Sequence, residues 1–147
     1  MPIINKKQTM QFHPCCLPIS PRYYKAIEKQ VSQANLANEA TSLTINFRDS
    51  SYSADAGGYH PVEMMIRQEG DKWHICYITD FAYTGGPYPE LAIELDFNLE
   101  CNTFRQMFAK PCDLAHRGVK SFYRMWEGNF LAYLSNGVFD QIKVTAN

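Results

Sequence analysis

The stretch from residue 91 to residue 99 constrains the fold more than any other part of the sequence. Along it, apolar side chains alternate strictly with acidic, polar or small ones, and the apolar set is Leu91, Ile93, Leu95, Phe97 and Leu99. Successive side chains of a strand point to opposite faces of a sheet. The pattern therefore predicts a strand with one apolar and one solvated face, and a second layer of structure that covers the apolar face.

Four further segments show the same period of two. We predict strands at residues 43–47, 62–66, 73–77 and 103–109, with Gly70-Asp71 as the turn of a hairpin. Trp73, Ile75 and Tyr77 are expected on one face of their strand. Residues 49–58 and 81–89 are rich in turn-forming residues, which predicts two loops.

Two segments have the helical period instead. Ser20 before Pro21 is a typical helix start, and an apolar stripe at spacings of three and four then predicts a helix to about Asn38. A second helix is predicted from about Asp113. Its stripe is mostly aromatic and consists of Val119, Phe122, Tyr123, Trp126, Phe130, Tyr133 and Leu134.

The second helical pattern contains two glycines and a clear end. Gly118 and Gly128 are expected to mark breaks or close backbone contacts, because glycine disfavours helix interiors. Asn136-Gly137 predicts the end of the helix. Residues 138–144 then suggest a closing strand, with a helical continuation as the alternative.

The order of these elements predicts an α+β fold. We expect a twisted antiparallel sheet of about five to six strands, with an N-terminal helix and a long aromatic C-terminal helix packed on it. The 147 residues are enough for one domain. Residues 1–19 contain three prolines and are expected to form an N-terminal arm, with a short strand near Gln8–Phe12, and residues 20–147 a single domain.

Composition excludes several functional classes. The net charge of −1 gives no electrostatic reason to expect nucleic acid as a partner. The longest apolar run, Phe130–Leu134, is far shorter than the roughly 20 residues of a membrane span, so no membrane association is expected. The first residues lack the apolar run of a secretory signal. We therefore expect a cytoplasmic protein whose five cysteines are reduced thiols.

Candidate metal ligands and nucleophiles have unspecific spacing. His13, Cys15 and Cys16 lack the second ligand pair of a zinc site, so neither a metal nor a cofactor is expected. A thiol nucleophile needs a histidine base. His74 with Cys76, and Cys112 with His116, have compatible spacing, but packed or capping side chains are the favoured explanation of such unspecific pairs. We therefore expect no enzyme.

Charged side chains separate along the chain. An acidic series, interpreted as a solvated sheet face, consists of Asp80, Glu90, Glu94, Asp96 and Glu100. A basic stripe follows on the second helix at Arg117, Lys120 and Arg124, and it could contact phosphate or an acidic partner. Such complementary patches permit self-association. Tyr83 and Tyr88 add aromatic area to the loop at residues 81–89.

Three stretches carry a resemblance to known proteins: Leu91–Phe97, Phe122–Tyr133 and Gly137–Val144. They resemble a family of uncharacterised small proteins of Vibrio and related gammaproteobacteria, often encoded on mobile or pathogenicity islands. The resemblance implies the fold of the mitochondrial acidic matrix protein that binds complement component one, a strongly twisted antiparallel sheet with helices at both chain ends. That protein is strongly acidic and forms a ring-shaped trimer, whereas this chain is near neutral. The resemblance supplies no catalytic residues.

These observations predict a non-enzymatic protein–protein interaction module that forms a homo-oligomer and binds an unidentified protein partner. Its expected binding residues are Tyr83, Tyr88, Arg117, Lys120 and Arg124. One alternative is a small-molecule or lipid-binding domain with an aromatic pocket between sheet and helix. The other is a cysteine-dependent hydrolase.

Overall fold

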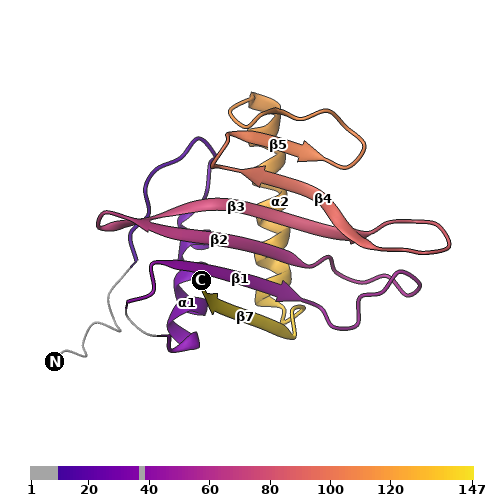
Figure 1. Ribbon diagram of the computed structural model, residues 1–147, viewed down its shortest axis with the longest axis horizontal. Helices are drawn as coiled ribbons and strands as arrows, with labels where there is room; N and C mark the ends of the chain where they lie inside the picture. The colour runs from indigo at the N-terminus through magenta and orange to yellow at the C-terminus, as the bar shows by residue number, and fades with distance from the viewer. Residues whose placement is uncertain (1–9, 37–38) are drawn as a thin grey trace.

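A single antiparallel sheet with two helices on one face makes up the structure, a computed structural model that describes residues 10–36 and 39–147 (Figure 1). The helices are α1 (Pro21–Ala34) and α2 (Arg117–Ser135). The strands are β1 (Ser42–Arg48), β2 (Val62–Glu69), β3 (Lys72–Tyr83), β4 (Leu91–Asn98), β5 (Thr103–Gln106), β6 (Cys112–Asp113) and β7 (Gln141–Ala146). This confirms the α+β class.

The sheet has seven strands in the order β6-β5-β4-β3-β2-β1-β7. The sequence predicted five to six, and the additional strand is β6, whose two residues are too short to show a period. The ambiguous C-terminal segment is a strand rather than a helical continuation. It lies antiparallel to β1, with Ile142 opposite Phe47, and so adds an edge strand at the far side from β6.

The core fills the space between the inner face of the sheet and the two helices. Phe130 of α2 lies at its centre, because its ring is 5.1 Å from that of Phe47 on β1 and 5.6 Å from that of Phe139. Tyr23 of α1 and Tyr123 of α2 are fully buried. Burial of these rings, at about 25 cal/mol per Å² of apolar area, is the main stabilising contribution to the packing of helices on sheet.

The helix α1 begins as predicted and ends earlier. Ser20 is its N-cap, and the Ser20 Oγ accepts a hydrogen bond from the Tyr23 N–H at 3.3 Å. The predicted end near Asn38 is wrong, because Asn35 adopts a left-handed conformation (φ 54°) that terminates the helix. Residues 37–38 lie outside the described residues.

The segment before α1 contacts the end of a strand. Gln8 and Thr9 of the predicted short strand lie outside the described residues, while Phe12 forms one parallel bridge with Trp73. The Trp73 N–H donates to the Gln11 carbonyl and its own carbonyl accepts from the His13 N–H, both at 2.8 Å. The division into an arm at 1–19 and a domain at 20–147 stays a prediction.

Two register shifts in the sheet change which side chains face the helices. Between β2 and β3, Met65 pairs with Tyr77 and Ile66 pairs with Ile75, so Cys76 has no partner and forms a bulge. The alternation reverses there. Ile78 is therefore buried in the core, and the prediction that Tyr77 shares the inner face of Ile75 is wrong: its hydroxyl donates to Glu63 at 2.7 Å instead.

The second shift lies between β3 and β4. Asp80 pairs with Leu95 and Phe81 pairs with Ile93, so Glu94 is the extra residue. Beyond this bulge, Leu91 and Ile93 lie on the outer face, opposite to that of Leu95, because paired residues share a face. They are 36% and 40% exposed. The predicted inward position of these two residues is therefore wrong.

Other boundaries differ in smaller ways. Residues 81–83 belong to β3, so the predicted loop at 81–89 begins only at Thr84. Gly128 lies inside an unbroken α2, and a Cβ atom there would meet nothing within 4 Å, so it marks neither a break nor a close contact. Among the described residues, neither helix has the length and apolar character needed to cross a membrane.

Candidate functional site

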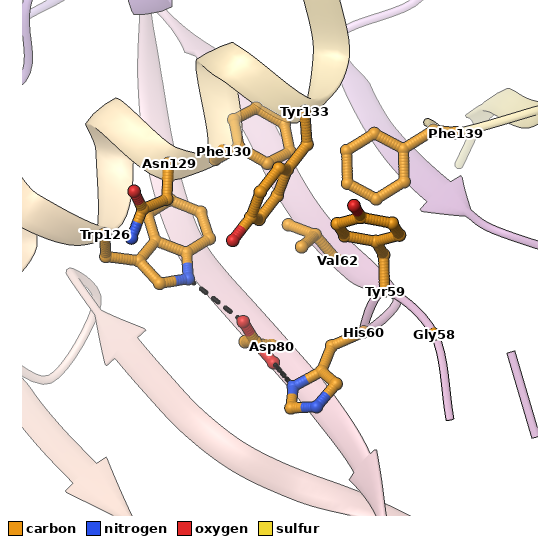
Figure 2. Close-up of a pocket in the computed structure, with 10 residues that line it drawn as sticks. All are labelled: Gly58, Tyr59, His60, Val62, Asp80, Trp126, Asn129, Phe130, Tyr133 and Phe139. Carbon is orange, nitrogen blue, oxygen red and sulfur yellow. Dashed lines mark hydrogen bonds and ion pairs between the residues drawn. The ribbon is translucent and has the colours of Figure 1, made fainter. Parts of the chain in front are cut away.

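A pocket opens between the sheet and the C-terminal half of α2, at the end of the sheet where β2 begins and β3 ends (Figure 2). Its volume is about 280 Å³. Residues with aromatic or polar groups make up most of its lining, namely Tyr59, His60, Asp80, Trp126, Asn129, Phe130, Tyr133 and Phe139. The pocket thus combines apolar walls with a polar floor.

The walls come mainly from one face of α2. Trp126, Phe130 and Tyr133 are spaced by four and three residues and therefore point to the same side of the helix. Tyr133 meets Tyr59, from the loop before β2, with ring centroids 4.8 Å apart. Both tyrosines are partly exposed, at 37% and 43%, so they border the opening.

The loop that carries Tyr59 and His60 has a defined shape. A Cβ atom at Gly58, whose φ is 136°, would lie 2.9 Å from Tyr52 Cα, so only glycine fits there. The Asp49 carboxylate accepts the Tyr59 N–H at 3.1 Å and closes the loop. These contacts fix the backbone of the two residues that precede His60.

The floor of the pocket is a cluster of three charged side chains. His60 Nδ1 lies 2.9 Å from Asp80 Oδ1 and 3.1 Å from Glu94 Oε2. The hydrogen bond to Asp80 is the largest influence on His60 and raises its pKa, although burial acts in the opposite direction. The Trp126 Nε1–H donates to the other Asp80 oxygen at 3.0 Å. The charges of both carboxylates act in the same direction as this hydrogen bond and also raise the pKa of His60.

Glu94 is placed in this cluster by its bulge. Its Oε2 atom is inaccessible to solvent and accepts no hydrogen bond, the one such buried side-chain atom among the described residues. The side chain as a whole is 38% exposed, so only its inner oxygen is enclosed. The predicted solvated position of Glu94 beside Asp96 is wrong.

The rest of the acidic series is also dispersed. Asp96 is buried on the other face and accepts the Thr79 hydroxyl at 2.8 Å. Glu100 pairs with Arg67 at 2.6 Å, which lowers the pKa of Glu100. Glu90 and Glu100 are exposed, as a solvated series predicts, but they lie at opposite ends of β4. The acidic half of the predicted complementary patches is therefore not a single surface.

The predicted binding residues lie in two separate places. Tyr83 ends β3 and Tyr88 lies in the loop that follows, where it is 87% exposed. Arg117, Lys120 and Arg124 lie in the first half of α2, and within the described part of the chain none of them forms an ion pair. The structure does not bring the basic and the aromatic residues together at the pocket.

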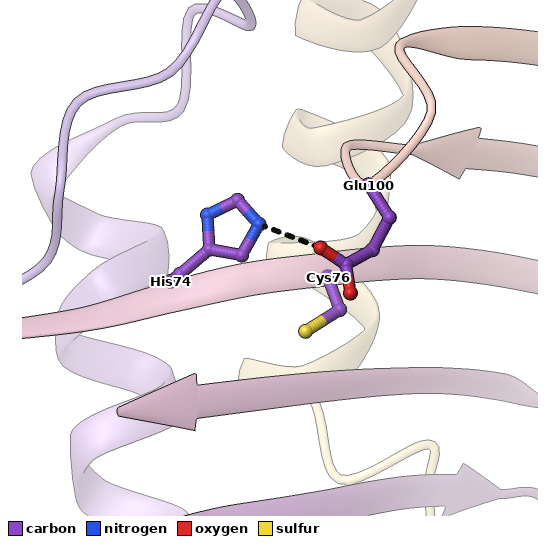
Figure 3. A group of neighbouring side chains, drawn as sticks. All are labelled: His74, Cys76 and Glu100. Atoms are coloured by element: carbon purple, nitrogen blue, oxygen red, sulfur yellow. Dashed lines mark ion pairs between the residues drawn. The ribbon is translucent and has the colours of Figure 1, made fainter. Parts of the chain in front are cut away.

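A second cluster contains His74, Cys76 and Glu100 (Figure 3). His74 Nε2 lies 3.4 Å from a carboxylate oxygen of Glu100. The contact of the Cys76 thiol is with Arg67 instead, whose Nη1 donates to Cys76 Sγ at 3.4 Å. Burial raises the pKa of Cys76 to about 11, so the thiol is protonated near neutral pH and is a poor nucleophile.

The other candidate pairs have structural partners. The His116 Nδ1 accepts the Gly118 N–H at 3.0 Å and caps α2, while Cys112 lies in the edge strand β6. The His13 ring contacts the Glu69 carbonyl at 2.8 Å, and the Cys15 thiol donates to the Leu17 carbonyl. These contacts give the cysteine-hydrolase alternative no support.

Sequence reasoning offered an aromatic pocket between sheet and helix as one alternative, but it did not identify the residues that line it. Trp126 and Tyr133 were assigned to the core stripe of α2, and His60 was not singled out. No pattern separated Trp126 and Tyr133 from the rest of the stripe, which has the usual width for a helix packed on a core. The bulge at Glu94 could not be predicted, because the alternation from Leu91 to Leu99 is regular in the sequence.

Comparison with known proteins gives a family but no activity. Residues 21–145 match a family described as a protein of unknown function, DUF2787. No curated protein matches the chain.

Two solved structures from Vibrio cholerae are similar over nearly their whole length. A hypothetical protein from the VSP-II pathogenicity island is 42% identical, with a TM-score of 0.87, over 94% of this chain and 99% of its own. A conserved hypothetical protein from pathogenicity island VPI-2 is 40% identical, with a TM-score of 0.80, over 91% and 99%. The latter is described as sharing structural homology with the human P32 protein.

These findings confirm the resemblance stated from the sequence, including the fold like that of P32. With 125 consecutive positions matched, from 21 to 145, the chain belongs to the DUF2787 family of proteins of unknown function.

Proposed function

We propose that the protein is a non-enzymatic protein–protein interaction module that self-associates through the end of the β3–β4 hairpin. The contact surface, which we term the hairpin patch, consists of Tyr83, Tyr88, Leu91 and Ile93. The observation that carries the proposal is the bulge at Glu94, which turns Leu91 and Ile93 onto the open face of the sheet beside Tyr83. Exposed apolar and aromatic groups of this kind are typical of interfaces.

The edge of β4 supports the same proposal. β5 pairs with β4 only from Leu95 to Asn98, so the backbone of residues 91–93 has a strand on one side only. A free edge with apolar side chains is a template for pairing with another strand. Antiparallel pairing of this segment with its copy is self-complementary, as a two-fold dimer requires.

The basic residues of α2 lie outside the hairpin patch. For Arg117, Lys120 and Arg124 we propose a separate contact with phosphate or an acidic partner protein. The dependence of binding on salt concentration distinguishes the two kinds of contact. Screening at about 1 M salt weakens an ionic contact, whereas an apolar contact persists.

Light scattering coupled to size-exclusion chromatography at micromolar concentration tests the self-association. We expect an oligomer at both low and high salt, and a monomer for Ile93→Lys. Met125→Lys is the matched control, because Met125 is an apolar residue of α2 that is 57% exposed. A monomeric wild-type protein, or dissociation by Met125→Lys alone, would contradict the proposal.

The pocket favours a second candidate function, the binding of a small molecule. Its volume of about 280 Å³ is close to the lower end of ligand sites, roughly 300–1,000 Å³. Its aromatic walls suit a flat apolar group. Native mass spectrometry of the purified protein detects a retained ligand, which a Tyr133→Ala variant is expected to lose.

A further inference from the structure

We propose that His60, Asp80 and Glu94 bind a divalent transition-metal ion, with Zn²⁺ as the ion that best suits the donor set. The site lies at the floor of the pocket, where His60 and Asp80 point toward each other (Figure 2). It is independent of the hairpin patch and of self-association.

The three donor atoms already converge. His60 Nδ1 lies 2.9 Å and 3.1 Å from the nearest oxygens of Asp80 and Glu94, and all three ligand atoms lie within 4.8 Å of one another. Nitrogen and oxygen ligands about 2.0–2.2 Å from a tetrahedral Zn²⁺ are about 3.3–3.5 Å apart. Small side-chain movements are enough to seat the ion.

One carboxylate oxygen of the cluster, Glu94 Oε2, lacks a hydrogen-bond donor. A proton on His60 Nδ1 that points at Asp80 leaves Glu94 Oε2 without a partner, and this oxygen is closed off from water. An enclosed carboxylate oxygen is costly without a partner. A divalent cation satisfies both carboxylates and neutral imidazole at once, and their summed charge is then zero.

A hydrogen bond from Trp126 and the bulge in β4 orient the proposed ligands, as outer residues do in known metal sites. The Trp126 Nε1–H donates a hydrogen bond to Asp80 Oδ2 at 3.0 Å, which leaves Asp80 Oδ1 facing His60. Ligating carboxylates are commonly held by such outer hydrogen bonds. The bulge in β4 brings Glu94 to the same place, and bulges often redirect a side chain toward a functional site. Three protein ligands leave a fourth position for water or for a ligand in the pocket.

The other cluster of possible ligands is less suited to a metal. In the His74, Cys76 and Glu100 group, the Arg67 guanidinium contacts Glu100 at 2.6 Å and the Cys76 thiol at 3.4 Å. The Arg67 cation therefore already contacts two of the three possible ligands. No basic side chain other than His60 itself contacts Asp80 or Glu94 in the described part of the chain.

The full-length protein, freed of metal with a chelator, is titrated with ZnCl₂ in a calorimeter. We expect one equivalent of Zn²⁺ to bind, with affinity at least tenfold lower for His60→Ala and for Glu94→Gln. His74→Ala is the control from the other cluster and is expected to bind like the wild type. Trp126→Phe, which removes the outer hydrogen bond to Asp80, is expected to weaken binding about tenfold.

Spectroscopy separates loss of ligands from loss of fold. Co²⁺ in place of Zn²⁺ is expected to give visible absorption bands of a four-coordinate site, absent in Glu94→Gln although its circular dichroism stays native. The proposal is overturned if the wild type takes up no Zn²⁺ saturably, if His60→Ala and Glu94→Gln bind normally, or if only His74→Ala loses binding. Ile93→Lys is expected to bind Zn²⁺ unchanged, so the tests of the two proposals fail separately.

Discussion

Glu127 connects the two helices through buried hydrogen bonds. Its Oε1 accepts the Ser20 N–H at 3.0 Å and the Tyr123 hydroxyl at 2.9 Å, and the residue is only 7% exposed. Ser20 is also the cap of α1. One carboxylate therefore fixes where α1 starts relative to α2, across 107 positions of sequence.

We predict that Glu127→Leu lowers the free energy of unfolding by about 3 kcal/mol, because the Ser20 N–H and the Tyr123 hydroxyl lose their acceptor. Glu127→Gln retains an amide oxygen at nearly the same place and should lose less than half as much. Urea unfolding followed by circular dichroism measures both values. Equal losses for the two variants would show that the charge, rather than the acceptor, matters at this position.

Bulges and glycines determine the finer shape of the secondary-structure elements. The bulges at Cys76 and Glu94 exchange the faces of β3 and β4, which creates both the pocket floor and the hairpin patch. The two glycines of α2 differ from each other. Gly128 is exposed with open space around it, whereas a Cβ atom at Gly118 would lie 3.2 Å from the capping His116 ring.

Gly128→Ala is expected to stabilise the protein by about 1 kcal/mol, because alanine favours a helix interior and nothing obstructs its methyl group. Gly118→Ala should give no such gain, since its methyl group crowds His116. Thermal unfolding followed by far-ultraviolet circular dichroism, which reports secondary structure, compares the two variants. A destabilising Gly128→Ala would indicate that another chain packs against this face of α2.

At the scale of the whole molecule, the C-terminal strand completes the sheet. β7 pairs with β1 over six positions, from Leu43 opposite Ala146 to Arg48 opposite Gln141. Its half-buried Ile142 and Val144 pack against the core. Without it, β1 becomes an exposed edge next to the centre of the core.

A chain that ends at Asp140 is therefore expected to lose about 3 kcal/mol or more of stability, from the burial of two aliphatic side chains alone. It should also aggregate, since the edge of β1 is free to pair with other chains. Removal of Asn147 alone, which loses its backbone hydrogen bond to Ser42 at 2.9 Å, should cost about 1 kcal/mol. Urea midpoints and turbidity measure these effects, and a stable, monomeric shortened chain would contradict the role given to β7.

Local pattern was sufficient for most of the architecture. Ser20-Pro21, the alternation at residues 43–47 and the Gly70-Asp71 turn each predicted the element found there. Each of these signals depends on a few neighbouring residues and the fixed geometry of helix or strand. The residues that form the candidate site were not predicted to meet, because Asp80 and Trp126 come together only after α2 has packed across the sheet.

The sequence by itself determined the fold class, the positions of the main strands and helices, and the start of α1. Only the tertiary structure decided the register of β4 on β3, the place of β7 beside β1, and the meeting of His60, Asp80 and Glu94. The physical reason is that periodicity reports which side of one segment is apolar. The register between two segments depends instead on packing summed over the whole interface, where one extra residue reverses every side chain beyond it.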